Sequence, residues 1–349
     1  MKTNRRFSAI VLAVFLLIAI YPILRPRSTN DDPSQSDTLV LYCAHDATYA
    51  KAIIEQFEKA TGISVDVRFD EEANKSLGLT NLIVAEKDNP RCDVFWNNQT
   101  LGTIRLVQAG VLQKYVSPNA ERIPSQFRDA DGFWTGFAGR LRVYLLNRDT
   151  VATADDTPIE ILSRASLSRV AIAKPQFGTT LSHYSVLAAE LGVTGLQDWH
   201  NDLHGRGIRE VRGNSMTKDL VAEGICDLGF TDTDDAYVAI DAGKPVTMLP
   251  IELDDGRTIC LPNSVAMVKD CRHPKMAQQL IDFLLSEDTE IALAQSKARQ
   301  IPLGSVDETK IPDDVKPLKQ WAMNSVTLTK AAEVNQQVLD WLTAEHTGQ

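Results

Sequence analysis

The amino-acid sequence predicts an α/β fold of two lobes. Between residues 38 and 96, strand-like and helix-like segments alternate in β-α-β-α-β order, which is typical of a parallel sheet covered by helices. A second α/β set begins at residue 169, after a long strand-like run at 132–147. The chain has 349 residues, and at roughly 150 residues per domain this length suits two domains.

The first set can be assigned in order from its apolar patterns. TLVLYCA (38–44) is a short apolar run typical of a buried parallel strand, and SVDVRF (64–69) alternates as a second strand. Between them, Ile53 and Phe57 lie on one helix face, and Gly62 ends that helix. We then expect a helix from Leu77 to Glu86, a strand at 93–96 and a helix from Gln99 to Ala109.

The second set follows the same two periodicities. The apolar patterns predict strands at 132–147, 169–175, 226–232, 245–251 and 258–270, and amphipathic helices at 179–192, 273–296 and 330–345.

The first 37 residues are expected to direct the protein out of the cytoplasm. Lys2, Arg5 and Arg6 precede an unbroken apolar stretch at 7–24, which is long for a signal-peptide core and just long enough to span a membrane. Residues 28–37 are polar and unpatterned, as in a flexible tether. We therefore expect a periplasmic or other extracytoplasmic body, with 7–24 either cleaved or retained as an anchor to the cytoplasmic membrane.

Charge and cysteine content narrow the class of protein. The formal net charge is −10, which argues against nucleic-acid binding because that requires a basic surface. The five cysteines include no CxxC pair. Buried, reduced cysteines are the expectation, and one disulfide between Cys260 and Cys271 remains an alternative in an exported protein.

Motifs of catalysis are missing from the sequence. It contains no GxSxG, HExxH, Walker-type phosphate loop or GxGxxG. We therefore expect no enzymatic activity and no catalytic cofactor. A hydrolase that uses an acidic cluster and a metal ion is the alternative, as is a membrane-tethered sensor or scaffold.

An acidic cluster is the most informative feature of the chain. Asp232, Asp234 and Asp235 directly follow the predicted strand at 226–232. Three carboxylates this close repel one another unless water or a cation neutralises them, and hard cations such as Fe³⁺, Ca²⁺ or Mg²⁺ take oxygen ligands. An ammonium group is a second possible partner, and plain turn or cap chemistry a third.

Further polar residues follow other predicted strands. Ligands of open α/β sheets bind beyond the carboxyl ends of strands, where His45 and Asn98 are expected. Asp46 there is interpreted as a helix N-cap. Gly178, Thr179 and Thr180 open a predicted helix, whose free N–H groups favour an anion.

From about Leu39 to Leu303 the chain resembles the periplasmic substrate-binding proteins of bacterial ABC importers, in the branch that includes ferric-iron-binding and thiamine-binding relatives. The matching stretches are LYCAHD (41–46), AIIEQFEKATGISVDV (52–67), LIVAEKDNPRCDVFWNNQ (82–99), GRLRVYLLN (139–147), LPNSVAMVK (261–269) and HPKMAQQLIDFLLS (273–286).

The resemblance implies a two-lobed clamp of type II, with two Rossmann-like lobes joined by crossover hinge strands. We expect residues 38–140 and 245–298 to form the first lobe, and residues 141–244 and 299–349 to form the second.

The resemblance also implies a site between the lobes. His45 lies at or next to the family's metal-binding His, and Asn98 replaces a Glu ligand. Asp234 and Asp235 replace the adjacent pair of iron-binding tyrosines, which argues against tyrosinate binding there. The family's anion pocket falls on Gly178, Thr179 and Asn214, with Thr180 and Ser215 beside it.

The resemblance thus implies a receptor that binds ferric iron, with carbonate or phosphate as a second ligand. The metal ligands would be His45, Asp232, Asp234 and Asp235, and Gly178, Thr179, Thr180, Asn214, Ser215 and Asn98 would bind the anion or solute. Thiamine, its phosphates or an organophosphonate is the alternative ligand. We expect a monomer whose partner is an ABC permease in the cytoplasmic membrane.

Overall fold

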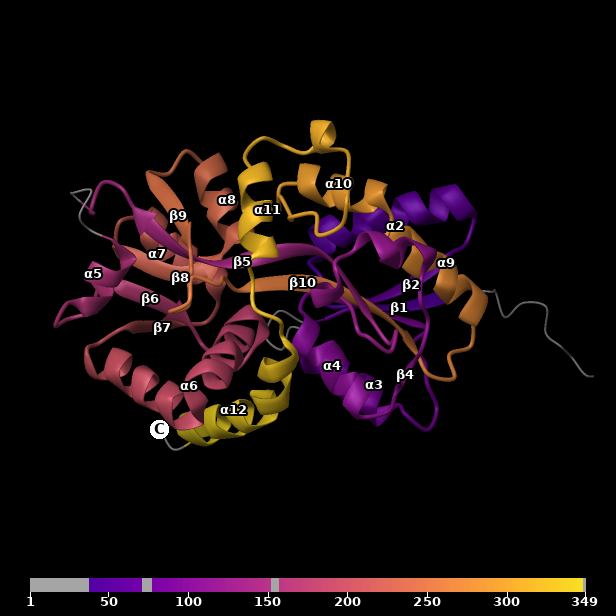
Figure 1. The fold of residues 1–349 in the computed structure, drawn as a ribbon, viewed down its shortest axis with the longest axis horizontal. Helices are drawn as coiled ribbons and strands as arrows, with labels where there is room; N and C mark the ends of the chain where they lie inside the picture. The colour runs from indigo at the N-terminus through magenta and orange to yellow at the C-terminus, as the bar shows by residue number, and fades with distance from the viewer. Residues whose placement is uncertain (1–37, 71–76, 152–156, 348–349) are drawn as a thin grey trace, which may run out of the picture. The chain divides into compact units, whose positions relative to one another are not determined.

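A computed structural model of the chain describes residues 38–70, 77–151 and 157–347 (Figure 1). The chain divides into two units, Met1–Thr38 and Leu39–Gln349, and every described helix and strand lies in the second unit. The predicted apolar segment at 7–24 and the tether at 28–37 lie outside the described residues. Within the described ranges, no helix combines the length and the apolar character that crossing a membrane requires.

Ten strands of the described chain form one continuous sheet. Their order is β2-β1-β3-β10-β5-β8-β6-β7, with β4 paired to β10 and β9 paired to β5. The strands are β1 (Leu39–Cys43), β2 (Val65–Phe69), β3 (Val94–Asn97), β4 (Leu112–Gln113), β5 (Thr135–Asn147), β6 (Val170–Ala173), β7 (Arg209–Val211), β8 (Leu228–Asp232), β9 (Val246–Pro250) and β10 (Cys260–Val268). β1 is parallel to β2 and β3, and β6 is parallel to β7 and β8, as the α/β alternation predicts.

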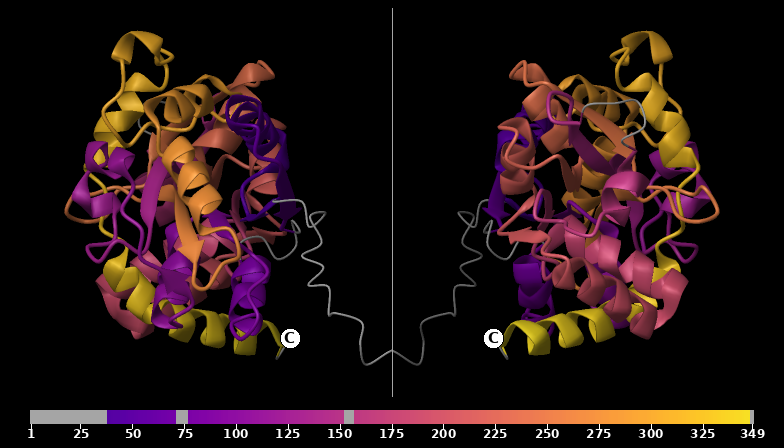
Figure 2. Two further views of the ribbon diagram at one scale, coloured as in Figure 1. Left: turned by 90° about the vertical axis from the view of Figure 1, so that its right-hand side faces the viewer. Right: turned by 90° about the vertical axis from the view of Figure 1, so that its left-hand side faces the viewer.

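Helices connect these strands and pack beside them (Figures 1 and 2). They are α2 (Ala47–Thr61), α3 (Leu77–Ala85), α4 (Thr100–Gln108), α5 (Pro158–Ser163), α6 (Gly178–Gly205), α7 (Asn214–Ala222), α8 (Thr233–Asp241), α9 (Pro274–Leu284), α10 (Glu287–Gln295), α11 (Lys316–Met323) and α12 (Thr329–Thr347). Short 3₁₀ helices lie at Pro118–Arg122, Ser125–Phe127 and Glu308–Lys310.

The two long central strands, β5 and β10, carry the chain across the middle of the sheet. β5 pairs with β10 from Thr135 to Leu141, and with β8 and β9 from Arg142 onward. The β5–β10 register shifts between Pro262 and Asn263. Because Leu39–Gln349 is one compact unit, the division into lobes at residues 140 and 244 stays a prediction.

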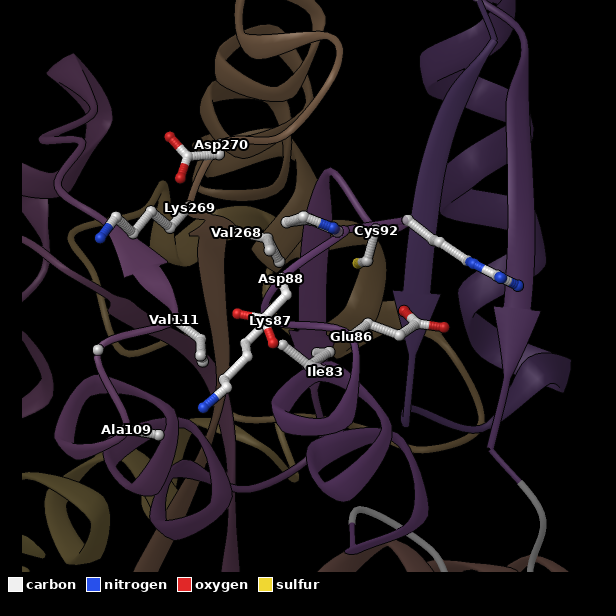
Figure 3. Close-up of a pocket in the computed structure, with 13 residues that line it drawn as sticks. Ile83, Glu86, Lys87, Asp88, Cys92, Ala109, Val111, Val268, Lys269 and Asp270 are labelled. Atoms are coloured by element: carbon white, nitrogen blue, oxygen red, sulfur yellow. The ribbon is translucent and has the colours of Figure 1, made fainter.

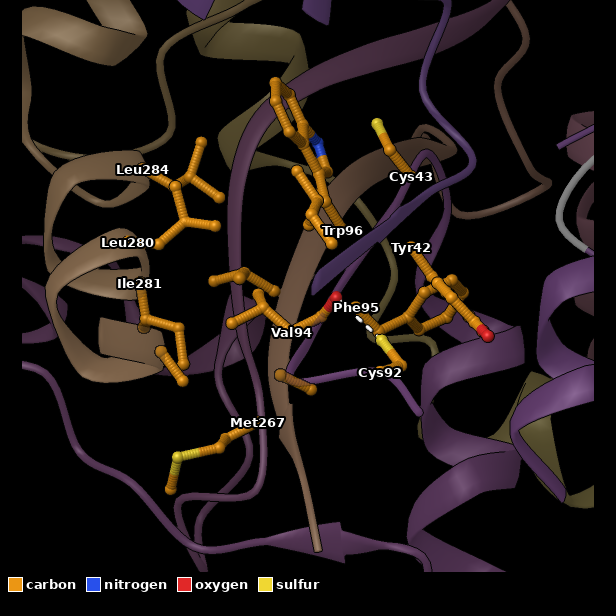
Figure 4. Close-up of a cluster of buried hydrophobic side chains, with 14 of the residues drawn as sticks. Tyr42, Cys43, Cys92, Val94, Phe95, Trp96, Met267, Leu280, Ile281 and Leu284 are labelled. Carbon is orange, nitrogen blue, oxygen red and sulfur yellow. Dashed lines mark hydrogen bonds between the residues drawn. The ribbon is translucent and has the colours of Figure 1, made fainter. Parts of the chain in front are cut away.

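The β1–β3 half of the sheet has its own hydrophobic core (Figure 4). Val94 and Phe95 of β3 belong to this core, as do Leu280 and Leu284 of α9, and Phe95 lies on the side of Tyr42 and Cys92. α2 contributes Ile53 and Phe57, the apolar face that its spacing predicts. The helix ends at Gly62, whose φ of 74° lies in the left-handed region that favours glycine.

The β6–β8 half buries apolar side chains on both faces of the sheet. Ile172 and Phe230 belong to a core shared with α6 and α12, whereas Val143 and Ala171 belong to a core on the other face. α12 packs along α6 and also contacts α4 (Figures 1 and 2). Because strand side chains alternate between faces, Arg140 and Arg142 of β5 project to the side opposite Val143.

Two predicted helices differ from those observed. The predicted helix at 273–296 is two helices, because Ser286 caps a new one by accepting a hydrogen bond from the Thr289 N–H. The helix predicted at 179–192 continues to Gly205 through a kink at Gly192, whose φ is 76°.

The cysteines are free thiols. Cys43, Cys92, Cys226, Cys260 and Cys271 are all buried and unbridged. This confirms the expectation of reduced, buried cysteines, and the alternative Cys260–Cys271 disulfide is not formed.

Candidate functional site

The acidic cluster lies where β8 passes into α8. Asp232 is the last residue of β8, and Asp234 and Asp235 lie in the first turn of α8. A helix N-terminus favours negative charge, so the helix stabilises the two carboxylates in its first turn. One carboxylate oxygen from each of the three aspartates lies within 4.8 Å of the others. The three side chains can therefore contact one ligand.

Asp232 is held by a buried network. Its Oδ1 accepts a hydrogen bond from Arg142 Nη1 at 2.7 Å. Its Oδ2 accepts bonds from Thr179 Oγ1 at 2.6 Å and Asn214 Nδ2 at 2.9 Å. Thr180 Oγ1 donates to Asn214 Oδ1 at 3.3 Å. Three of the residues predicted for the anion pocket are thus bonded to Asp232 or to each other, and they position that carboxylate.

Asp234 pairs with a second buried arginine. Arg140 Nη1 lies 2.9 Å from Asp234 Oδ2, and Arg140 is 4% exposed. Although burial opposes it, the carboxylates of Asp234, Asp232 and Asp46 raise the pKa of Arg140 above its ordinary value. The guanidinium is therefore charged, and it balances one carboxylate of the cluster.

Sequence reasoning missed both arginines. They appeared only as letters within the strand-like run GRLRVYLLN (139–147). A signal was available, because charged residues inside an apolar strand are rarely buried unless they are paired. Two arginines two residues apart also lie on the same face of a strand, which points to one charged site.

Both guanidinium groups keep unused donors. Nε and Nη2 of Arg140 and of Arg142 are buried, and no described residue accepts a hydrogen bond from them. Leaving buried charged donors without an acceptor is costly. An anion within reach would satisfy these donors.

Asp235 differs from its two neighbours. Thr231 Oγ1 donates to its Oδ2 at 3.4 Å, and neither arginine is paired with it. Burial, and then the charges of Asp234 and Asp232, raise the pKa of Asp235 well above its ordinary value, against the opposing charges of Lys218 and Arg140. This carboxyl therefore holds its proton more strongly than an exposed aspartate does.

Two residues near the β1–α2 junction, Asp46 and Tyr49, are electrostatically coupled to the cluster. Asp46 occupies the N-cap position of α2, although its side chain makes no cap hydrogen bond. Tyr49 lies in the first turn of α2. Burial, and then the carboxylates of Asp234, Asp46 and Asp235, raise the pKa of Tyr49, while Arg140 lowers it. The phenol is thus electrostatically coupled to the acidic cluster.

The other predicted residues are placed as follows. His45 is buried and stacks on Trp96 with ring centroids 5.2 Å apart. Asn98 is buried after β3. Gly178 opens α6 with a φ of 55° and has open space where a Cβ would project. Ser215 is exposed at the second residue of α7.

A pocket of the described chain lies away from the acidic cluster. Its volume is about 220 Å³, and Figure 3 shows it between the ends of α3, α4 and β10. Ile83, Val111 and Val268 line it, among charged side chains such as Lys87 and Asp88. None of the predicted site residues lines this pocket. A smaller pocket brings together Gln99 and Gly178 from the two halves of the sheet.

Polar side chains from both halves of the sheet thus lie near β5 and β10, the strands that join the halves. Such an arrangement can bind a solute between the two halves. This fold and site define a solute-binding protein. The chain belongs to the family of bacterial extracellular solute-binding proteins, whose model matches residues 39–296.

The chain is also similar in sequence to two curated proteins. The chain is 25% identical over 293 residues to iron uptake protein A1 of Synechocystis sp., covering 80% of each chain. It is 24% identical over 280 residues to iron uptake protein A2 of the same organism, covering 75% of this chain and 77% of that protein.

Solved structures confirm the predicted fold class, the two-lobed α/β clamp of periplasmic binding proteins. Iron-bound HitA from Pseudomonas aeruginosa matches with a TM-score of 0.76 at 23% identity, over 87% of this chain and 99% of that chain. A Trichodesmium protein in complex with iron and citrate matches with a TM-score of 0.71 at 20% identity, over 88% and 98%.

Proposed function

We propose that this protein is the extracytoplasmic iron-binding receptor of an ABC importer. The observation that carries the proposal is the set of carboxylates at the β8–α8 junction, Asp232, Asp234 and Asp235, whose oxygens lie within 4.8 Å of one another. Hard cations prefer such oxygen ligands. The curated relatives named as iron uptake proteins support iron as the cation.

Each carboxylate has a different part in this proposal. Asp234 and Asp235, in the first turn of α8, offer oxygens to the ion. Asp232 is held by Arg142, Thr179 and Asn214, so it contributes a fixed charge beside the ion. Asp46 approaches from α2, on the other half of the sheet, and acts electrostatically on Arg140. Binding would therefore draw the two halves together.

We place an anion at the arginines. Thr179 and Asn214 are bonded to Asp232, whereas Nε and Nη2 of Arg140 and Arg142 have no acceptor among the described residues. A carbonate, phosphate or carboxylate would accept from these donors and would complete the coordination of the iron. Gly178, Thr180, Ser215 and Asn98 stay candidate contacts to this anion, and His45 stays a candidate beside the metal.

Delivery to a membrane permease follows from membership of an extracellular solute-binding family. We propose that residues 7–24 either serve as a cleaved export signal or keep the body at the outer face of the cytoplasmic membrane. We also propose that the receptor acts as a monomer and catalyses no reaction.

A ligand panel tests the proposal. A ligand that binds only the folded state raises the melting temperature as RT ln(1 + [L]/Kd) requires. Fe³⁺ with carbonate, phosphate or citrate should raise it, whereas thiamine, thiamine phosphate and an alkylphosphonate should not. Stabilisation by one of the organic compounds without iron would contradict the proposal, as would hydrolysis of any of them.

A further inference from the structure

Two histidines of α6 lie side by side after the kink in that helix. The kink is at Gly192, and the two halves of α6 pack against each other, because Tyr184 before the kink contacts His200 after it. His200 and His204 are one helical turn apart, and their ring centroids are separated by 4.1 Å. Two histidines at this spacing present two imidazoles on one helix face, a pairing that zinc sites use.

A carboxylate from the neighbouring strand lies beside this pair. Glu210 belongs to β7, the last strand at its edge of the sheet, and it pairs with Ile172 of β6. Paired residues project to the same face of a sheet, so Glu210 projects to the face where Ile172 shares a core with α6 and α12. Its Oε2 lies 3.7 Å from His204 Nε2. Two imidazoles and a carboxylate therefore meet at this edge of the sheet.

The separation between His204 and Glu210 suits two ligands of one metal ion. At 3.7 Å it is longer than an ordinary hydrogen bond between nitrogen and oxygen, which is about 2.7–3.2 Å. A nitrogen and an oxygen that each bind one tetrahedral Zn²⁺ at about 2.0–2.1 Å lie roughly 3.4 Å apart. The two side chains are 33% and 15% exposed, so an ion can reach them from solvent.

Tyr184 orients His200 from the buried side. Its hydroxyl oxygen lies 3.1 Å from His200 Nδ1, and both residues are buried. Burial, and then the charge of Glu210, raise the pKa of Tyr184 against the opposing charge of Arg142, so the phenol stays neutral. Trp341 of α12 packs edge-on against His200, with ring centroids 5.3 Å apart. Partners of this kind fix the ring of a metal-binding histidine by bonding the nitrogen that does not bind the metal.

We propose that His200, His204 and Glu210 bind one divalent transition-metal ion such as Zn²⁺. Each histidine contributes Nε2, Glu210 contributes a carboxylate oxygen, and water fills the fourth position of a tetrahedral site. His200 Nδ1 then carries the proton and donates it to the Tyr184 hydroxyl oxygen. The ion fastens α6 to β7 beside α12.

This site differs in chemistry from the acidic cluster, and the inference does not depend on the proposed iron site. The cluster at the β8–α8 junction offers carboxylate oxygens alone. Imidazole nitrogens favour zinc, copper and nickel, whereas carboxylates suit harder cations. The nature of the ligand atoms therefore provides a way to distinguish metal bound at the two places.

A zinc titration of matched variants tests the proposal. The full chain is purified free of metal and titrated with Zn²⁺ by calorimetry. Its parent form carries Asp234→Ala and Asp235→Ala, which remove the acidic cluster as a competing site. His204→Gln and Glu210→Gln are the test variants, because both side chains are partly exposed and their loss leaves the core intact. Circular dichroism checks that every variant is folded.

The matched control is another histidine–carboxylate pair. His273 Nδ1 lies 2.9 Å from Asp93 Oδ2, and His273→Gln removes this histidine without touching the proposed site. A second measurement needs no substitution at the site. Cu²⁺ bound to the parent form is examined by pulsed electron paramagnetic resonance, which detects the nitrogen of a coordinated imidazole and gives no such signal for a carboxylate.

The parent form should bind one Zn²⁺ per chain, and its Cu²⁺ spectrum should show two imidazole nitrogens. His204→Gln and Glu210→Gln should each weaken zinc binding at least about 100-fold, whereas Tyr184→Phe, which removes an outer partner, should weaken it about 10-fold. His273→Gln should bind as the parent does. Unchanged zinc affinity in either test variant, a Cu²⁺ spectrum without imidazole nitrogen, or a parent that binds no Zn²⁺ would overturn the proposal and leave His204 and Glu210 as an ion pair only.

Discussion

Arg142 Nη1 lies 2.7 Å from Asp232 Oδ1, and the two side chains are 0% and 2% exposed. This pair joins the middle of the sheet to the acidic cluster, because Arg142 pairs with Asp232 in the β5–β8 register. Asp232 is therefore paired with a cation before any ligand arrives. A neighbouring pair, Arg140 with Asp234, repeats the arrangement two residues earlier on β5.

Removal of Arg142 should destabilise the protein strongly. Arg142→Ala leaves the Asp232 carboxylate buried and unpaired, and breaking a buried ion pair from one side costs roughly 3–5 kcal/mol. Urea unfolding should show a correspondingly lower free energy of unfolding. Lys114→Ala is the control, because its pair with Asp131 is exposed and worth about 1 kcal/mol or less. Equal effects of the two substitutions would contradict the role assigned to Arg142.

Substitution of Glu290 should also destabilise the protein strongly, because this side chain accepts several buried hydrogen bonds. It is fully buried and accepts hydrogen bonds from the backbone N–H groups of Ala138, Leu303 and Gly304 and from Arg122 Nη2. Glu290→Gln removes the negative charge and turns an amide N–H₂ toward groups that are themselves hydrogen-bond donors. The free energy of unfolding, measured in urea, should therefore fall by about 3 kcal/mol or more.

The exposed Glu333→Gln is the control for Glu290→Gln and should stay within about 0.5 kcal/mol of the wild type. If Glu290→Gln were as stable as this control, the stabilising role assigned to the hydrogen bonds that Glu290 accepts would be wrong.

The free energy of unfolding of the ligand-free protein should depend on pH through the carboxyl group of Asp235. Its pKa is raised in the folded state, so between the ordinary value of 3.8 and the raised value the folded state holds a proton that the unfolded state has lost. The contribution of this carboxyl to stability is thus present at low pH and falls as pH rises through that window. Asp235→Asn should be more stable than the wild type at about pH 8 and should lose that advantage toward about pH 4.

Unfolding in urea across this pH range measures the effect. Asp254→Asn replaces an exposed aspartate and should follow the wild-type curve at every pH. A wild-type curve that rises with pH relative to Asp235→Asn would contradict the assigned direction.

The five thiols should be unreactive in the native protein. All are buried, and burial raises the pKa of Cys271 to about 11, which lowers its thiolate fraction at neutral pH. A colorimetric thiol reagent should therefore titrate almost no cysteine in buffer and all five in denaturant without reductant. A count of three in denaturant would reveal a disulfide, contrary to the structure.

The sequence predicted the outline of the fold because apolar residues recur with the period of a helix or a strand in most elements. The parallel β1–β3 unit and α2, with its apolar face and terminal glycine, follow directly from local pattern. α7 was not predicted, because the segment is short and its N-cap residue, Gly213, has no side chain to mark the start of a helix. Ser286 is a typical N-cap residue and could have indicated the start of α10. It was instead included in one long amphipathic helix predicted at 273–296.

The candidate site was predicted only in part. Asp232, Asp234 and Asp235 stood out because they follow an apolar strand, and the structure brings them together. The pairing of Arg140 and Arg142 with two of these aspartates depends on which strands are neighbours in the sheet. Strand order and register arise from long-range packing, which one sequence does not display. Thr179 and Asn214, predicted for an anion pocket, both donate hydrogen bonds to Asp232, and their contact with an anion stays a prediction.

The most direct test of the proposed iron site is the iron affinity of the cluster, measured by competition with citrate. Wild-type protein should bind one Fe³⁺ per chain. Asp234→Ala and Asp235→Ala should each weaken binding by about 30- to 5,000-fold, the equivalent of roughly 2–5 kcal/mol for one member of a buried charged contact. The exposed Asp254→Ala should bind as the wild type does. Wild-type affinity in both cluster variants would contradict the proposal that this acidic cluster binds the iron.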